Sequence, residues 1–112
     1  MKVTYRQAAS DDLVRQFRYY LVTLGLPETV VRFREAVRHT VEFLRRHPRV
    51  GPRHYTGAQP LNNLRSWPVA GFEAIRIYYL LNQDEDTIRV VRILHGKRDV
   101  KGILKPEDLS AD

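Results

Sequence analysis

The stretch FEAIRIYYLL at residues 72–81, the polar turn at residues 82–86 and the run TIRVVRILH at residues 87–95 decide the fold. A period of two, typical of a β-strand, predicts two faces for residues 72–81: Ile75, Ile77, Tyr79 and Leu81 on one, and Arg76, Tyr78 and Leu80 on the other. The polar cluster that follows predicts a hairpin turn, and residues 87–95 are apolar enough for a central strand. Together these residues predict two antiparallel strands.

A third strand is predicted immediately upstream, at residues 64–69. Pro68 lacks the backbone N–H that a central strand donates, so this strand is expected near an edge of the sheet. Ala70-Gly71 then turns the chain into residues 72–81. The three runs predict an antiparallel meander.

A long loop is predicted at residues 48–63, where glycine, proline and asparagine interrupt both helical and strand periodicity. Loops of this length in small domains are commonly functional, although the loop could also simply wrap the core. The loop residues with chemistry suited to a contact are Arg49, Arg53, His54 and Tyr55.

Two helices are predicted between an N-terminal strand at Lys2–Arg6 and this loop. Ser10-Asp11-Asp12 is a helix start, with a capping hydroxyl and two acids near the positive end of the helix dipole. This first helix ends at Gly25, and Pro27 opens a second helix that ends before Pro48. The short connection requires an antiparallel hairpin. Apolar residues at helical spacing are Leu13, Phe17, Tyr20, Leu21 and Leu24 in the first helix and Val30, Phe33, Val37, Val41 and Leu44 in the second.

The predicted fold is therefore α+β: a two-layer sandwich of an N-terminal strand, an antiparallel helical hairpin and a three-strand antiparallel meander. The length of 112 residues fits a single domain over residues 1–112, and without cysteine no disulfide can form. The acidic end, residues 105–112, is expected to be a flexible tail.

The charge of the chain points to an anionic partner. It carries a net charge of +6, and 15 of its 19 basic residues are arginine. Arginine offers a planar fork of donors for phosphate or carboxylate, so the partner would be a nucleic acid or an acidic protein. An ordinary basic surface remains the alternative. The second helix carries four arginines on the side away from its apolar stripe. They either form an ordinary solvated face or contact an anionic partner: Arg34, Arg38, Arg45 and Arg46.

Several function classes find no support in the sequence. It has no glycine-rich phosphate loop, no HExxH and no cysteine pair, and its four histidines are scattered, so we expect no cofactor and no metal site. No apolar run approaches the ~20 residues of a membrane span, and the N-terminus has no apolar signal core. A soluble cytoplasmic protein is expected.

A cluster of charged residues follows the predicted strands. In a simple register, Arg65 and Arg76 share one face of the sheet and form a cationic patch able to hold phosphate. Alternatively, Arg76 and Arg92 pair with acids such as Asp99 or Glu73 and are structural. The candidate partner-binding residues are Arg65, Trp67, Arg76, Arg92, His95, Arg98 and Asp99.

Three strings in the chain resemble the RelE/ParE superfamily of type II toxin-antitoxin toxins. They are NLR at residues 63–65, GF at 71–72 followed by RIYY at 76–79, and VRILHGKRD at 91–99. The resemblance covers nearly the whole chain and implies the same strand-helix-helix-meander fold. It also implies a hetero-oligomer with an antitoxin whose acidic C-terminal segment folds against the toxin.

The superfamily divides by mechanism. RelE-like members are ribosome-dependent, metal-independent mRNA endoribonucleases, and by resemblance the catalytic residues here would be Arg76, His95 and Arg98. This chain has Arg65 and Trp67 where RelE-like enzymes carry two lysines, and Leu104 in place of their near-terminal tyrosine. Arginine stabilises a charged phosphate but cannot accept the 2′-hydroxyl proton. The chain is thus more similar to the ParE branch, the plasmid stabilisation proteins that bind DNA gyrase. A ribonuclease is the alternative, and enzymatic activity is left open.

Overall fold

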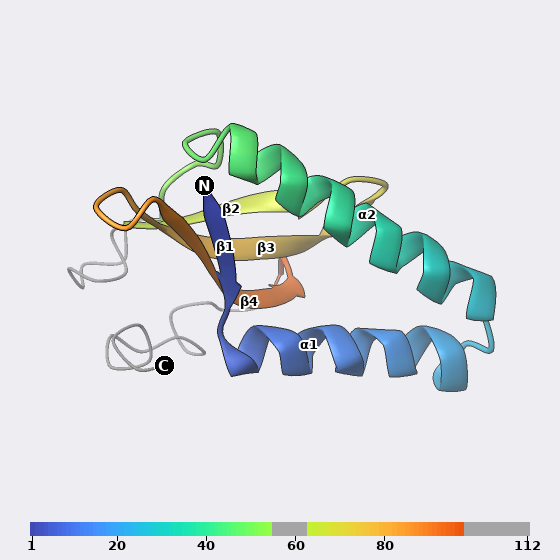
Figure 1. The fold of residues 1–112 in the computed structure, drawn as a ribbon. Coiled ribbons are helices and arrows are strands. Elements are labelled where there is room, and N and C mark those ends of the chain that lie inside the picture. The colour runs from blue at the N-terminus through green and yellow to red at the C-terminus, as the bar shows by residue number, and fades with distance from the viewer. Residues whose placement is uncertain (55–62, 98–112) are drawn as a thin grey trace.

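A computed structural model describes residues 1–54 and 63–97 of the chain. Within them, two helices joined by a π-helical turn pack against a four-stranded sheet (Figure 1). The expected tail at residues 105–112 lies outside the described residues. The elements are β1 (Lys2–Tyr5), α1 (Gln7–Arg18), the π-helical turn η1 (Tyr19–Thr23), α2 (Pro27–Arg46), β2 (Leu64–Val69), β3 (Phe72–Asn82) and β4 (Thr87–His95).

The predicted meander is confirmed. β2 pairs with β3 and β3 pairs with β4, both antiparallel. β1 pairs with β4 in parallel, with Lys2 opposite Thr87, so the order across the sheet is β1-β4-β3-β2. The helical hairpin carries the chain from β1 to β2 at the opposite edge of the sheet, and β3 and β4 then lead back until β4 lies beside β1. The α+β expectation is correct.

The start of α1 differs from the expectation. The helix begins at Gln7, preceded by Arg6 in extended conformation, and no side chain caps it. The Arg6 N–H donates to the Val90 carbonyl at 2.9 Å, so β1 stays paired up to this point and the chain turns into the helix at once. Ser10 and Asp12 therefore lie inside the helix, and Asp12 is buried instead of capping its end.

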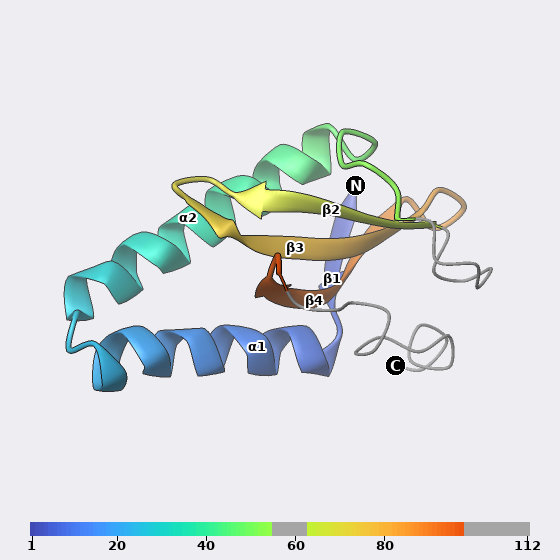
Figure 2. The same ribbon diagram turned by 180° about the vertical axis from the view of Figure 1, so that it is seen from behind.

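The tip of the helical hairpin extends beyond the sheet (Figures 1 and 2). Tyr20 still packs on Phe33, with ring centroids 5.4 Å apart. Beyond it, Leu21 and Leu24 were expected on the apolar face but are exposed. The wider π-helical turn shifts the face that the first helix presents, and the sheet does not reach the tip. Gly25 ends the turn with a positive φ of 63°.

The second helix matches its predicted apolar stripe. Phe33, Val37, Val41 and Leu44 are buried against the sheet. The opposite side of α2 carries ion pairs, among them the exposed pair of Arg38 with Glu35, as expected of a solvated face. The buried core between the layers consists of Ala9, Phe33, Val37, Val41, Leu44, Val69, Ile75, Ile77, Tyr79, Ile88, Val90 and Ile93.

The two faces of the sheet differ in what covers them. α2 crosses one face of β2 and β3 in Figure 1, and Figure 2, from behind, shows these strands in front of it. We call these the helix face and the far face. In the described part of the chain, no helix is long and apolar enough to cross a membrane.

Candidate functional site

The strand register separates the two arginines that were expected to share a face. Arg65 lies opposite Tyr79, whereas Arg76 lies opposite Pro68. Paired residues point to the same face and successive residues alternate, so the three-residue step from Arg65 to Pro68 puts the two guanidinium groups on opposite faces. Arg65 follows Tyr79 onto the helix face, and Arg76 lies on the far face. The expected shared patch is therefore wrong.

Arg65 holds the loop that leaves α2. Its Nη1 donates to the carbonyls of Arg49 at 3.1 Å and Gly51 at 2.8 Å. The Tyr79 hydroxyl donates to the Pro48 carbonyl at 2.8 Å and accepts from the Gly51 N–H at 3.1 Å. A Cβ at Gly51 would lie 2.6 Å from this hydroxyl, so only glycine fits. Arg65 therefore has a structural role.

Trp67 also lies on the helix face, opposite Ile77. Its ring stacks on Phe43 of α2, with centroids 5.8 Å apart and planes inclined by 25°. It lines a shallow apolar hollow of about 200 Å³ with Thr40 and Ala70. Trp67 thus joins β2 to α2 and leaves only part of its surface for a partner.

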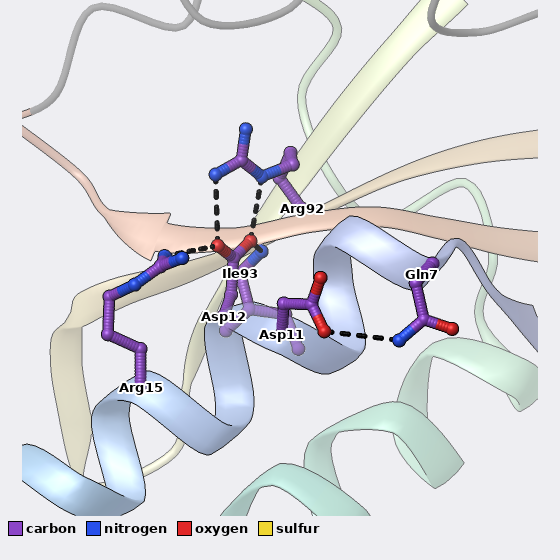
Figure 3. Close-up of polar contacts among 6 residues, drawn as sticks. All are labelled: Gln7, Asp11, Asp12, Arg15, Arg92 and Ile93. Atoms are coloured by element: carbon purple, nitrogen blue, oxygen red, sulfur yellow. Dashed lines mark hydrogen bonds and ion pairs between the residues drawn. The ribbon is translucent and has the colours of Figure 1, made fainter.

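Arg92 pairs with an acid that the sequence did not indicate. Its Nε and Nη2 donate to the two carboxylate oxygens of Asp12 at 2.8 and 2.9 Å (Figure 3). The Ile93 N–H donates to the same carboxylate at 2.9 Å. Because β1 ends at Tyr5, this stretch of β4 has no strand on the side away from β3, and α1 supplies the acceptor there. The Asp12 and Arg92 side chains are 2% and 16% exposed, so Arg92 joins α1 to the sheet.

His95 lies on the same side of the sheet as Ile75, its partner in β3. The imidazole is exposed and lines a groove of about 470 Å³ together with Tyr19, Tyr20 and Phe72. Arg76 is paired with the preceding residue, Leu94, and therefore projects from the other face. The sheet separates His95 from Arg76. Arg98 and Asp99 lie outside the described residues.

Four side chains meet on the far face of the sheet, and we call them the far-face cluster: His54, Ser66, Arg76 and Tyr78. Arg76 Nε donates to Ser66 Oγ at 3.0 Å, and His54 Nε2 lies 2.7 Å from the same oxygen. The His54 ring also contacts the Tyr78 ring, with centroids 5.6 Å apart.

Backbone hydrogen bonds of the loop that follows α2 position His54 in this cluster. The His54 N–H donates to the Leu64 carbonyl at 2.8 Å, and the Ser66 N–H donates to the Pro52 carbonyl at 3.3 Å. These bonds hold residues 52–54 along the outer edge of β2, where Arg53 forms a single antiparallel β-bridge with Arg65. The sequence marked His54 as a loop residue of interest, but it contained no signal that linked His54 to Arg76. Tyr55 lies outside the described residues.

The hydrogen bonds fix the tautomer of His54. Arg76 Nε can only donate, so Ser66 Oγ accepts from it. Ser66 is fully buried, and its own proton needs an acceptor, which among the described residues is His54 Nε2. The neutral ring then carries its proton on Nδ1. Burial, followed by the positive charge of Arg76, lowers the pKa of His54 below its ordinary 6.5, so the ring is neutral at pH 7.

Arg76 keeps most of its donors available. Its aliphatic stem passes over Gly96, where an added Cβ would lie 3.1 Å from Arg76 Cδ. Within residues 1–54 and 63–97, no carboxylate lies within ion-pair distance of this guanidinium. Burial raises the pKa of Tyr78 above its ordinary 10.0, so its phenol stays neutral. The described residues contain no group of three or more histidine, aspartate or glutamate side chains placed to bind a metal.

Comparison with solved structures shows the same fold in two toxin-antitoxin systems. The chromosomal ParDE system of P. aeruginosa matches with a TM-score of 0.66 and 17% identity, over 85% of this chain and 95% of that one. The intact E. coli RelBE complex matches with a TM-score of 0.53 and 13% identity, over 87% and 98%. The isolated E. coli RelE toxin also matches at 0.53, with 15% identity over 92% and 98%.

Sequence comparison gives the family. No curated protein sequence matches the chain. The family described as the ParE toxin of the type II toxin-antitoxin system parDE matches residues 3–100, which include all the strands and helices above except Lys2, the first residue of β1. The chain therefore belongs to the ParE toxin family of type II toxin-antitoxin systems.

Proposed function

We propose that this toxin arrests growth by binding DNA gyrase, and that an antitoxin with an acidic C-terminal segment neutralises it. The antitoxin partner is supported by the ParDE and RelBE systems that share the fold. Gyrase is the target that the resemblance to the ParE branch implies. The surface of the toxin that contacts gyrase would be cationic, because the chain carries a net charge of +6.

The observation that carries the proposal is the placement of the histidines relative to Arg76. RNA cleavage without a metal needs an acceptor for the 2′-hydroxyl proton close to the group that stabilises the phosphate. The sheet separates His95 from Arg76. His54 does lie beside Arg76, but its Nε2 is bonded to Ser66 and its Nδ1 carries the ring proton. The cluster therefore offers donors, and binding is favoured over cleavage.

The ribonuclease alternative assigned catalysis to Arg76, His95 and Arg98. The register of β3 and β4 does not favour this set, since the first two project from opposite faces. Arg98 lies outside the described residues. A ribonuclease is accordingly the less supported of the two functions.

Two surfaces suit an antitoxin segment. β1 is an edge strand that pairs only with β4 among the described strands, so an added strand can use its other side. The hairpin tip exposes an unusual set of apolar side chains, which a folding segment can cover. These are Leu21, Val22, Leu24, Leu26 and Val31.

Induced expression in a bacterium tests the target class. We expect growth arrest, filamentation and a DNA-damage response while bulk translation continues. Loss of translation with intact DNA would overturn the proposal in favour of the ribonuclease. The Asp12→Ala variant, which lacks the contact between α1 and β4, controls for the burden of expression and should arrest growth less.

A further inference from the structure

A groove opens where the helical hairpin extends past the end of the sheet (Figures 1 and 2). One wall comes from α1 and η1, and the other comes from the first residues of β3 and the last residue of β4. Its volume of about 470 Å³ is within the range of pockets that bind small ligands. The side chains of its lining that bear on its chemistry are Tyr19, Tyr20, Phe72, Glu73 and His95.

Three aromatic rings line this groove, and the core holds two of them. Tyr20 and Phe72 both pack edge-on against Phe33, which is fully buried, with centroids 5.4 and 5.2 Å away. The planes of Tyr20 and Phe72 are inclined by 52°, and those of Tyr19 and Tyr20 by 54°, so neither pair is stacked face to face. The rings therefore leave aromatic surface open to the groove.

Glu73 brings a carboxylate to the groove that no basic side chain neutralises. It is exposed and lies on the same face of β3 as Ile75, whereas Arg76 projects from the far face. Within residues 1–54 and 63–97, Glu73 forms no ion pair, although Asp12 and Glu42 are each paired with an arginine. Among the described residues, the lining includes neither lysine nor arginine, of which the chain has 19 in all. The groove is thus an acidic site on a basic protein.

We infer that this groove binds an arginine side chain of a partner protein. The guanidinium supplies the positive charge that Glu73 lacks, and cations are attracted to the faces of aromatic rings. Arginine is also weakly hydrated for a charged group, so it leaves water for such a site at a lower cost than an ammonium does. This inference does not depend on gyrase as the target, and it concerns a surface of the opposite charge to the one proposed to contact gyrase.

An ion pair on α2 shows why arginine fits both walls of the groove better than lysine. Arg45 binds Glu42 through one edge of its guanidinium, with Nε and Nη2 at 2.9 and 2.6 Å from the two carboxylate oxygens. Both faces of the guanidinium plane stay free in such a pair. An arginine bound to Glu73 through this edge can therefore pack a face on the Tyr20 ring, which the ammonium of lysine cannot do.

The test titrates the full chain with a short capped peptide that has glycines around a central arginine, and it follows the His95 ring signals and the Glu73 amide by NMR. A matched peptide with citrulline keeps the shape of the side chain but lacks its charge. We expect both sets of signals to shift, with a dissociation constant in the millimolar range that suits a single side chain. The citrulline peptide should bind about fivefold more weakly.

Two variants assign the binding to the groove. Glu73→Gln removes the charge with little change of shape and should weaken the arginine peptide about threefold, while the citrulline peptide is unaffected. Tyr19→Leu keeps an apolar side chain but removes an exposed ring, and it should also weaken the arginine peptide about threefold. The control Glu85→Gln removes a charge from the turn at the other end of β3, about 30 Å away by the rise of the strand. This distance exceeds the Debye length of about 10 Å in ordinary buffer, so the affinity should not change.

Three outcomes would overturn the inference. A leucine peptide that shifts the same signals at lower concentration than the arginine peptide would show that the groove recognises apolar side chains. Equal losses in Glu73→Gln and Glu85→Gln would show only general attraction between opposite charges. Self-association of the chain in size-exclusion chromatography that Glu73→Gln abolishes would assign the groove to a second copy of the chain instead of a partner protein.

Discussion

Replacing Asp12 with alanine should strongly destabilise the toxin. The carboxylate is 2% exposed and accepts from Arg92 Nε, Arg92 Nη2 and the Ile93 N–H, at 2.8, 2.9 and 2.9 Å (Figure 3). A fourth donor, Arg15, lies at 3.2 Å, but its side chain is 67% exposed and contributes little.

The expected loss follows from what the substitution leaves behind. Arg92 would keep a largely buried charge without this partner, and removing one member of a buried ion pair costs about 3–5 kcal/mol. Within that figure, an unsatisfied Ile93 N–H costs about 1–3 kcal/mol. The total is a large share of the roughly 5–15 kcal/mol by which a small domain is stable. The melting temperature should fall by about 4–8 °C for each kcal/mol lost.

Urea denaturation followed by far-UV circular dichroism measures this loss. Asp11→Ala is the matched control, because Asp11 is the neighbouring carboxylate and, within residues 1–54 and 63–97, makes only an exposed bond to Gln7 at 3.1 Å. It should cost less than about 0.5 kcal/mol. A double-mutant cycle between Asp12 and Arg92 should give a coupling of about 0.5–3 kcal/mol. If Asp12→Ala is as stable as Asp11→Ala, the structural reasoning is refuted.

Further predictions concern the loop and two titrating groups. Gly51→Ala should cost about 1–3 kcal/mol in a melting experiment, because the new Cβ would lie 2.6 Å from the Tyr79 hydroxyl; a neutral effect would contradict that packing. Side-chain hydrogen bonding to Arg45 lowers the pKa of Glu42 to about 2 from 4.5. Glu42→Gln should therefore lower the melting temperature at neutral pH, and its deficit should vanish as the pH falls from 4.5 to 2. Because the folded chain holds His54 neutral, wild-type stability should decrease below pH 6.5, and His54→Asn should reduce that slope in denaturant titrations.

The strands of the meander could be predicted because their residues alternate locally. Residues 72–81 and 87–95 lie on either side of an evident turn, so neither their pairing nor their direction needed long-range information. The register between β2 and β3 was harder to predict than their pairing. Counted back from the tight turn at Ala70-Gly71, where Val69 lies opposite Phe72, Arg65 would lie opposite Arg76. A register shift between Pro68 and Val69 places Arg65 opposite Tyr79 instead, and this irregularity sends the two arginines to opposite faces.

The partners of the charged residues were not predictable from spacing. Asp12 and Arg92 are 80 positions apart, and the local pattern around Asp12 is that of a helix start. The position of β1 beside β4 creates the need for that carboxylate, because β1 is too short to cover β4. Likewise, His54 reaches Arg76 only because Arg65 and Tyr79 hold the intervening loop against the sheet.

The central claim is that this toxin acts by binding and not by cutting, and a supercoiling assay with purified DNA gyrase tests it most directly. The account predicts that the purified chain inhibits supercoiling and leaves mRNA on translating ribosomes intact. Full supercoiling activity together with cleavage of that mRNA would contradict it.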